Sequence, residues 1–133
     1  MKVLLATSKP FALQAVQGIQ NVVETAGLEF EKIENYTEKS QLLDAVKDAD
    51  ALIVRSDKID GEVMDAAKQL KLIIRAGAGY DNVDLDAATS RNICVMNTPG
   101  QNANAVAELV FGMMIYMQRN KFDGSVGREL INR

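Results

Sequence analysis

The chain has 133 residues, 47% of them hydrophobic and 25% charged, which suits one globular domain with a buried core. A net charge of −3 without a dense Lys/Arg run argues against a nucleic-acid partner, and no apolar stretch has the length of a membrane span. The chain contains no His, which excludes the usual general base, the Ser-His-Asp triad and His-ligated metals, and no Asp/Glu group stands out as a metal site.

The first third of the chain is predicted to form a strand, a helix and a second strand. Val3–Ala6 is a continuous apolar run; it is too short for the apolar region of a signal peptide, so we expect a cytoplasmic location. A helix is expected to begin near Pro10, with Ser8 as its cap, and to end at Gly27. The second strand, about Leu28–Ile33, is interrupted by charged residues and is placed at an edge of the sheet. The apolar stripe of the helix consists of Phe11, Ala15, Ile19, Val22, Val23 and Ala26.

The same alternation continues along the chain. Continuous apolar runs, as expected for parallel strands covered on both faces, occur at Ala51–Val54, Leu72–Ile74 and Ile93–Met96. The only cysteine, Cys94, lies in the last run, where we expect a buried, unreactive thiol. Helices are expected after Thr37, after Asp60 and after Asp84, which would cap Leu85–Ser90. The inward positions of the first two of these helices are Leu42, Leu43, Val46, Val63, Ala66, Ala67 and Leu70.

Strict alternation of strands and helices predicts an α/β fold with one parallel sheet, right-handed crossovers and helices on both faces. Five strands, the second of them at an edge, fit the flavodoxin-like doubly wound order 2-1-3-4-5. In such sheets ligands bind beyond the carboxyl ends of the strands, near the switch in strand order. The residues that follow each strand are therefore the candidates for a functional site.

The segment after the fifth strand has a different character. A loop rich in turn formers, Asn97–Asn102, leads into Ala103–Met117, which is apolar except at Asn104, Glu108 and Gly112. A helix that is apolar almost all round must be covered on most sides, so we expect this extra C-terminal helix to pack on another domain or subunit. The alternative is a closing helix whose Met residues fill the core. Residues 118–133 are polar and lack a closing motif, so we expect the natural chain to continue.

The glycine-rich run after the fourth strand, Arg75–Asn82, is the most informative motif. It resembles a dinucleotide fingerprint, but Asn82 occupies the position where G-x-G-x-x-G requires its third glycine. With Gly77 and Gly79, the loop offers backbone N–H groups with little side chain around them, beside Arg75 and Asn82. This arrangement suits a small anion better than a dinucleotide.

Polar residues also follow the other strands. A guanidinium, a glycine-rich loop and nearby hydroxyl or amide groups together predict a pocket for a small oxyanion such as a carboxylate. Taken alone, Arg55 is equally well a solvated charge, and turn formation explains Asn97 and Asn102 as well as ligand contact does. The absence of an acidic cluster argues against a phosphoacceptor receiver, and the absence of glycine after the first strand argues against a flavodoxin. The residues at the strand ends are Thr7, Ser8, Arg55, Ser56, Arg75–Gly79, Asn97 and Thr98, with Asn102 just beyond.

Several segments form an ordered set along the chain: Val54-Arg55-Ser56, Leu72–Asp84, Ala87–Thr89, Asn97–Pro99 with Asn102, and Val106–Glu108. This set resembles the D-isomer-specific 2-hydroxyacid dehydrogenases over essentially the whole chain. The Arg-Ala-Gly-x-Gly-x-Asp-Asn-x-Asp form is most similar to the D-3-phosphoglycerate dehydrogenase branch of that family.

The resemblance implies a substrate-binding lobe at residues 1–98, followed at residues 99–133 by a hinge and the first helix of an NAD-binding Rossmann domain. The catalytic residues and most of the NAD site would belong to the part of that domain beyond Arg133, so no catalytic residue and no metal ligand is assigned in this chain. In the family the helix at Ala103–Met117 packs at the dimer interface, which implies a homodimer.

The resemblance also implies roles for individual residues. The backbone of Ala76–Gly79, with Gly77, Ala78 and Gly79, would hold the substrate carboxylate. Arg55 would bind the charged distal end of the substrate, and Ser56 is assigned to the same substrate site. Asn102 would line the cleft. Ala78 would lie near the cofactor but, lacking a hydroxyl, could contact it only through its backbone. Gly100–Ala105 lacks the Ser or Thr often found there, which leaves the exact hydroxy acid open.

Two functions remain. The first is the substrate-binding portion of an NAD-dependent D-2-hydroxyacid dehydrogenase that converts 3-phosphoglycerate to 3-phosphohydroxypyruvate on the route to serine, with no turnover by this chain alone. The second is a stand-alone flavodoxin-like module without enzyme activity, which binds a small anion or has a regulatory role. Continuation of the reading frame into a strand and G-x-G-x-x-G would favour the first, and a stop codon the second.

Overall fold

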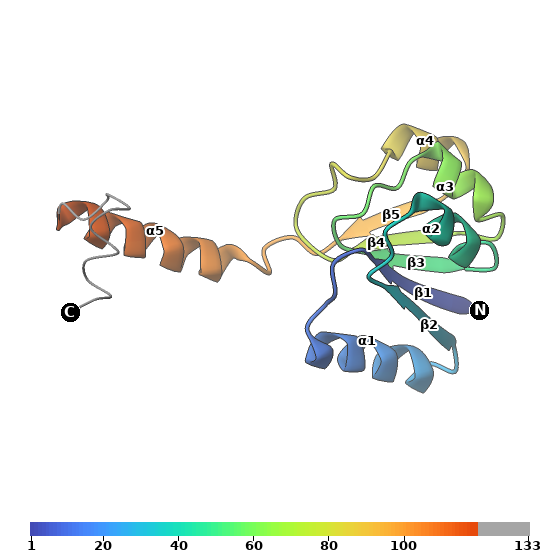
Figure 1. Cartoon of the computed structure of the whole chain (residues 1–133), viewed down its shortest axis with the longest axis horizontal. Helices are drawn as coiled ribbons and strands as arrows, with labels where there is room; N and C mark the ends of the chain where they lie inside the picture. The colour runs from blue at the N-terminus through green and yellow to red at the C-terminus, as the bar shows by residue number, and fades with distance from the viewer. Residues whose placement is uncertain (120–133) are drawn as a thin grey trace. The chain divides into compact units, whose positions relative to one another are not determined.

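The computed structural model describes residues 1–119 and divides into two units, Met1–Pro99 and a second that begins at Gly100. In the first unit, five parallel strands form one sheet in the order β2-β1-β3-β4-β5, which confirms the predicted flavodoxin-like arrangement (Figure 1). The strands are β1 (Lys2–Thr7), β2 (Glu29–Glu34), β3 (Ala51–Val54), β4 (Leu72–Arg75) and β5 (Cys94–Asn97). The helices of this unit are α1 (Leu13–Thr25), α2 (Lys39–Ala45), α3 (Gly61–Ala66) and α4 (Leu85–Ser90).

The helices are divided unequally between the faces of the sheet. In Figure 1, α1 lies on one face, whereas α2, α3 and α4 lie on the other. Leu4, Leu52 and Ile73 stand opposite one another on β1, β3 and β4, and all three are fully buried in the core beneath α2–α4. Leu5 and Ile53 point to the opposite face and belong to the smaller core beside α1.

The predicted cap of α4 by Asp84 is confirmed, and Asp60, after which a helix is expected, caps α3. The side chain of Asp60 accepts the backbone N–H of Val63 at the start of α3, and that of Asp84 accepts the N–H of Ala87 at the start of α4. The predicted start of the first helix is wrong: α1 begins at Leu13 behind Ala12 and has no side-chain cap. Ser8 is instead part of the loop after β1.

Two burial predictions on the α1 face are also wrong. Cys94 is exposed, and of the expected stripe on α1 the side chains of Ala15, Val22 and Ala26 are exposed. The reason is the same in both cases: within the described residues only α1 lies on this face. An apolar groove of about 590 Å³ remains between α1 and the sheet. Val23 is buried as expected, and Phe11 and Ile19 pack against the smaller core.

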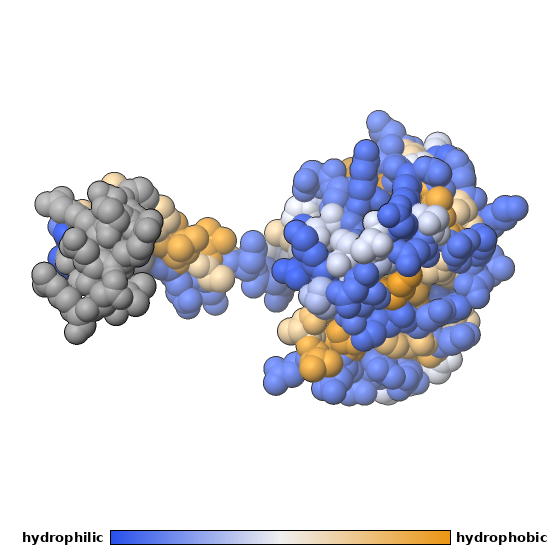
Figure 2. Space-filling model, in the orientation of Figure 1, coloured by the Kyte–Doolittle hydropathy of each residue, from blue (hydrophilic) through white to orange (hydrophobic). Residues whose placement is uncertain are grey.

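The second unit contains α5 (Ala103–Gln118), close to the predicted helix. None of its residues is buried, and Figure 2 shows hydrophobic residues on its surface. Leu109, Phe111 and Ile115 are each more than 60% exposed, at 62%, 66% and 64%. Within residues 1–119, no helix has the length and apolar character needed to cross a bilayer. The polar segment expected at the end of the chain lies, from residue 120 on, outside the described residues.

Candidate functional site

The sheet register brings the predicted arginine and the glycine loop to the same edge. Val54, the last residue of β3, stands opposite Arg75, the last residue of β4. The N–H of Ala76 then donates to the carbonyl of Val54 over 2.8 Å, so the two strands are still paired where their loops begin. Arg55 and the loop at residues 76–79 therefore leave the sheet side by side.

In the glycine loop, residues 76–79, two carbonyl groups accept hydrogen bonds from residues at the end of β5, and two N–H groups are free. The carbonyl of Gly77 accepts the N–H of Thr98 (2.9 Å), and that of Ala78 accepts the side-chain amide of Asn97 (2.7 Å). Within the described residues, the N–H groups of Ala78 and Gly79 donate to no partner. Asn97 thus holds the loop in place, and the free N–H groups are donors available to an anion.

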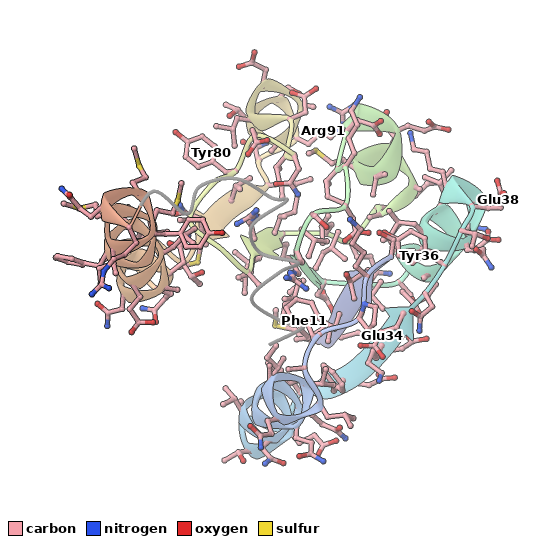
Figure 3. All side chains as sticks on the ribbon, turned by 60° about the vertical axis from the view of Figure 1, so that its left-hand side comes forward. Phe11, Glu34, Tyr36, Glu38, Tyr80 and Arg91 are labelled. Atoms are coloured by element: carbon pink, nitrogen blue, oxygen red, sulfur yellow. The ribbon has the colours of Figure 1, made fainter. Side chains whose placement is uncertain are left out.

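Two arginine side chains at this edge lack a carboxylate partner in the described part of the chain. The guanidinium of Arg55 is exposed and lies 6.0 Å from the ring centroid of Phe11, which Figure 3 labels between the sheet and α1. The guanidinium of Arg75 lies over Gly77: a Cβ built on that glycine would be 1.7 Å from Nη1. Its buried Nε has no hydrogen-bond partner. By contrast, Arg91 is fully engaged with Asp65. Unpaired guanidinium groups of this kind are suited to binding a carboxylate or phosphate.

One residue that the sequence reasoning missed is central to this edge. Asp57 is only 6% exposed, and its Oδ1 accepts the N–H of Ser8 (2.7 Å) and the hydroxyl of Tyr36 (2.6 Å). Its backbone carbonyl accepts a hydrogen bond from the side-chain amide of Asn82 (2.7 Å). The Asn82 side chain, which is expected beside a bound anion, is therefore engaged in a structural hydrogen bond. Tyr36 lies on the α2 side of the sheet in Figure 3.

Burial and hydrogen bonding change the pKa of both members of the Tyr36–Asp57 pair. Burial opposes ionisation of Asp57, but the hydrogen bonds from Tyr36 and Ser8 outweigh it and lower the pKa of the carboxyl group below its ordinary 3.8. Burial, and then the bond to Asp57, raise the pKa of the Tyr36 phenol above its ordinary 10.0. At neutral pH the pair is therefore a neutral phenol bound to a carboxylate.

The raised pKa of Tyr36 predicts a loss of stability in alkali. Above pH 10.0 the phenol ionises in the unfolded chain but stays protonated in the folded one, so the free energy of unfolding should fall as the pH rises past that value. We expect Tyr36→Phe to be less stable than wild type at pH 7 and to lose less stability between pH 9 and about 11. Urea denaturation measures this. Because the pKa values of Lys2 and Lys39 are also raised, the difference between the two proteins is the informative quantity, and equal slopes would contradict the assignment.

Comparison with known proteins places this geometry in a family. The family model described as "D-isomer specific 2-hydroxyacid dehydrogenase, catalytic domain" matches residues 5–126. The chain belongs to the D-isomer-specific 2-hydroxyacid dehydrogenases. The resemblance inferred from the ordered motifs is thereby confirmed, and the sheet of residues 1–99 is the fold of this family's catalytic domain.

Individual members of the dehydrogenase family show how much of such a protein this chain represents. A structure titled as cofactor (NAD+)-bound 3-phosphoglycerate dehydrogenase of Entamoeba histolytica shares 53% identity with a TM-score of 0.84, over 92% of this chain and 41% of that one. D-3-phosphoglycerate dehydrogenase of Methanocaldococcus jannaschii is 47% identical over 62% of this chain and 16% of that protein. Hydroxypyruvate reductase of Thermotoga maritima is 41% identical over 69% of this chain and 30% of that protein. The chain thus spans well under half the length of these relatives.

The structure brings together most, but not all, of the site residues predicted for this dehydrogenase chain. Arg55 and Ser56 are exposed at the end of β3, next to the loop of Gly77, Ala78 and Gly79. Asn102 lies in the second unit, directly before α5, and its place in a cleft stays a prediction. Within residues 1–119, no group of three or more Cys, Asp or Glu side chains is arranged to hold a metal.

Proposed function

We propose that this chain is the substrate-binding portion of an NAD-dependent D-2-hydroxyacid dehydrogenase that acts on 3-phosphoglycerate. The observation that carries the proposal is the set of unused cationic and N–H donors at one edge of the sheet: Arg55, Arg75 and the N–H groups of Ala78 and Gly79. An anionic hydroxy acid would satisfy these donors. The relatives named D-3-phosphoglycerate dehydrogenase favour a phosphorylated substrate.

The division of labour within the protein follows from these donors. The free N–H groups of Ala78 and Gly79 would bind the substrate carboxylate, and Arg55, with Ser56 beside it, would neutralise the phosphate at the other end. Holding the substrate by both ends fixes its hydroxyl-bearing carbon for reaction. This chain therefore supplies orientation and charge neutralisation, and the proton acceptor lies elsewhere in the protein.

The cofactor of this activity is NAD, which supplies the acceptor for a hydride when bound. The described residues have no loop with three glycines at fingerprint spacing, and we assign to this chain only one cofactor contact, through the backbone of Ala78. We therefore propose residues 1–98 as the substrate-binding lobe and residues 99–133 as the hinge and the beginning of a cofactor domain. A homodimer formed through α5 and a cytoplasmic location complete the proposal.

The proposal is tested by an NMR titration of the 133-residue chain. We expect 3-phosphohydroxypyruvate to shift the amide signals of Arg55 and Ala76–Gly79, and NAD to leave them unchanged. Hydroxypyruvate, which lacks the phosphate, should shift the glycine loop but not Arg55. With 3-phosphoglycerate and NAD, the same sample should form no NADH, because the proposal assigns no residue of this chain to hydride transfer.

Other outcomes of the titration would contradict specific parts of the proposal. Shifts with NAD centred on Gly77–Gly79 would mean that the glycine loop is a cofactor site. Equal shifts of Arg55 with hydroxypyruvate and with its phosphorylated form would contradict a phosphate-binding role for this arginine and favour hydroxypyruvate as substrate, in line with the Thermotoga maritima relative. NADH formation would show that the chain holds its own catalytic residues.

A further inference from the structure

Asp57 connects four loops at the carboxyl edge of the sheet. The residue follows β3; its side chain binds Ser8, which follows β1, and Tyr36, which follows β2. Its backbone carbonyl binds the side chain of Asn82, which follows β4. One residue thereby contacts segments that lie up to 49 residues away from it in sequence.

The two binding segments lie between a pair of ties that link the same two strands. The first tie is the hydrogen bond from Ala76 to Val54, before the loops begin. The second is the Asn82–Asp57 bond, extended by the N–H of Ile59 donating to the carbonyl of Asn82 over 2.8 Å. Arg55 and Ser56 lie between these ties on one strand connection, and residues 77–81 lie between them on the other. The Asp57 side chain holds the segment that carries Arg55 against the loops after β1 and β2, and the Asp57 backbone carbonyl ties the same segment to Asn82, just after the glycine loop. Together these bonds limit the distance between the backbone of Arg55 and the glycine loop.

The charge of Asp57 does not suit direct contact with an anion. A carboxylate near a bound phosphate or carboxylate repels it, and burying the carboxylate has its own desolvation cost. Oδ1 accepts two hydrogen bonds, whereas the buried Oδ2 has no partner. We therefore assign to the Asp57 carboxylate the role of a hydrogen-bond acceptor for Ser8 and Tyr36, and not that of a charge facing the ligand.

We propose that Asp57 is a positioning residue that sets the distance between Arg55 and the glycine loop and thereby the affinity for the anionic substrate. The expected effect on substrate affinity rests on the proposed function. The ordering of the loops by Asp57 does not.

Two substitutions separate the hydrogen bonds from the charge. Asp57→Ala removes the acceptor for Ser8 and Tyr36, whereas Asp57→Asn keeps an acceptor oxygen and places its amide nitrogen where Oδ2 has no partner. Asp50→Ala is the matched control, because Asp50 also accepts a backbone N–H across the sheet, that of Lys2 over 2.8 Å, but precedes β3 and lies at the opposite edge.

The test combines binding with backbone order. We expect Asp57→Ala to bind 3-phosphohydroxypyruvate about tenfold more weakly than wild type, and Asp57→Asn and Asp50→Ala to bind it as wild type does. In ¹⁵N relaxation without ligand, the order parameters of Ser8, Ser56 and Lys58 should fall in Asp57→Ala alone, because only this variant lacks the side-chain acceptor that ties these segments together. Thermal unfolding should show that Asp57→Ala and Asp50→Ala are both destabilised, which separates positioning from general stability.

The outcomes distinguish this inference from the proposed function. If wild type binds the analogue and Asp57→Ala binds it equally well, Asp57 does not position the site. If wild type binds no analogue, the proposed function fails, yet the relaxation data still decide whether Asp57 orders the loops. Unchanged order parameters in Asp57→Ala would overturn the inference in either case.

Discussion

Replacing Arg55 with Ala is expected to weaken binding of 3-phosphohydroxypyruvate by about ten- to a hundredfold, the size of effect for a charge-assisted hydrogen bond of about 1.5–3 kcal/mol. Its guanidinium is exposed, and no carboxylate among the described residues competes for it. Arg75→Ala should have a comparable effect, because this side chain lies over Gly77 at the start of the loop. Isothermal titration calorimetry on the 133-residue chain measures both.

Arg91→Ala is the control for the loss of a positive charge. Arg91 is bound to Asp65 through two nitrogens and follows α4 instead of a strand. It should leave the dissociation constant unchanged. Hydroxypyruvate supplies a second control, since Arg55→Ala should affect its binding much less than that of the phosphorylated form. Equal affinities of wild type and Arg55→Ala for the phosphorylated form would remove Arg55 from the site.

Placing carboxylates on α5 is expected to break the proposed homodimer. Leu109 and Phe111 are strongly exposed and lie about 200° apart around the helix axis, so Leu109→Asp/Phe111→Asp introduces a charge on each of two opposite sides. An unpaired carboxylate at a buried interface costs several kcal/mol, which should weaken association by more than about a hundredfold. Sedimentation velocity over a range of concentrations measures the effect.

The matched control adds the same two charges to polar positions of the same helix. Asn104→Asp/Gln118→Glu changes the net charge of α5 as much as the first variant does and should leave the dimer intact. Circular dichroism should show the same helix content in all three proteins. A monomeric wild type with α5 folded would contradict the proposed interface.

Much of the fold could be predicted because each strand carries its own signal. Continuous apolar runs at β1, β3 and β4 indicated strands buried on both faces, and Asp60 and Asp84 marked helix starts by a local rule. Cys94 was placed wrongly because its burial depends on what covers the α1 face, which no local pattern in the sequence encodes. Ser8 resembled a cap by type and position, but its N–H is used by a residue 49 positions away.

The parts of the site that could be predicted are short runs of consecutive residues directly after a strand. Arg55 and Gly77–Gly79 stood out because a guanidinium and a glycine loop follow neighbouring strands. Asp57 did not, because a single Asp in a surface-like sequence carries no mark of burial. Its partner Tyr36 is 21 residues away, and only the folded sheet brings the two together. Asn82 was expected beside the anion for its amide group, and that group serves Asp57 instead.

The strand order also has a consequence for how the chain is made. β1 is paired on one side with β2 and on the other with β3, and every pairing in the sheet is parallel, so no tight hairpin can nucleate it. Contacts of this range must close long loops first, which places folding in the slower, millisecond-to-second class. On the ribosome, Leu4 and Leu5 emerge early but have only the edge strand β2 as a partner until Ala51–Val54 has been synthesised. A nascent chain that stalls before Val54 leaves one side of β1, with its apolar run Val3–Ala6, unpaired, and chaperone binding should be strongest in that interval.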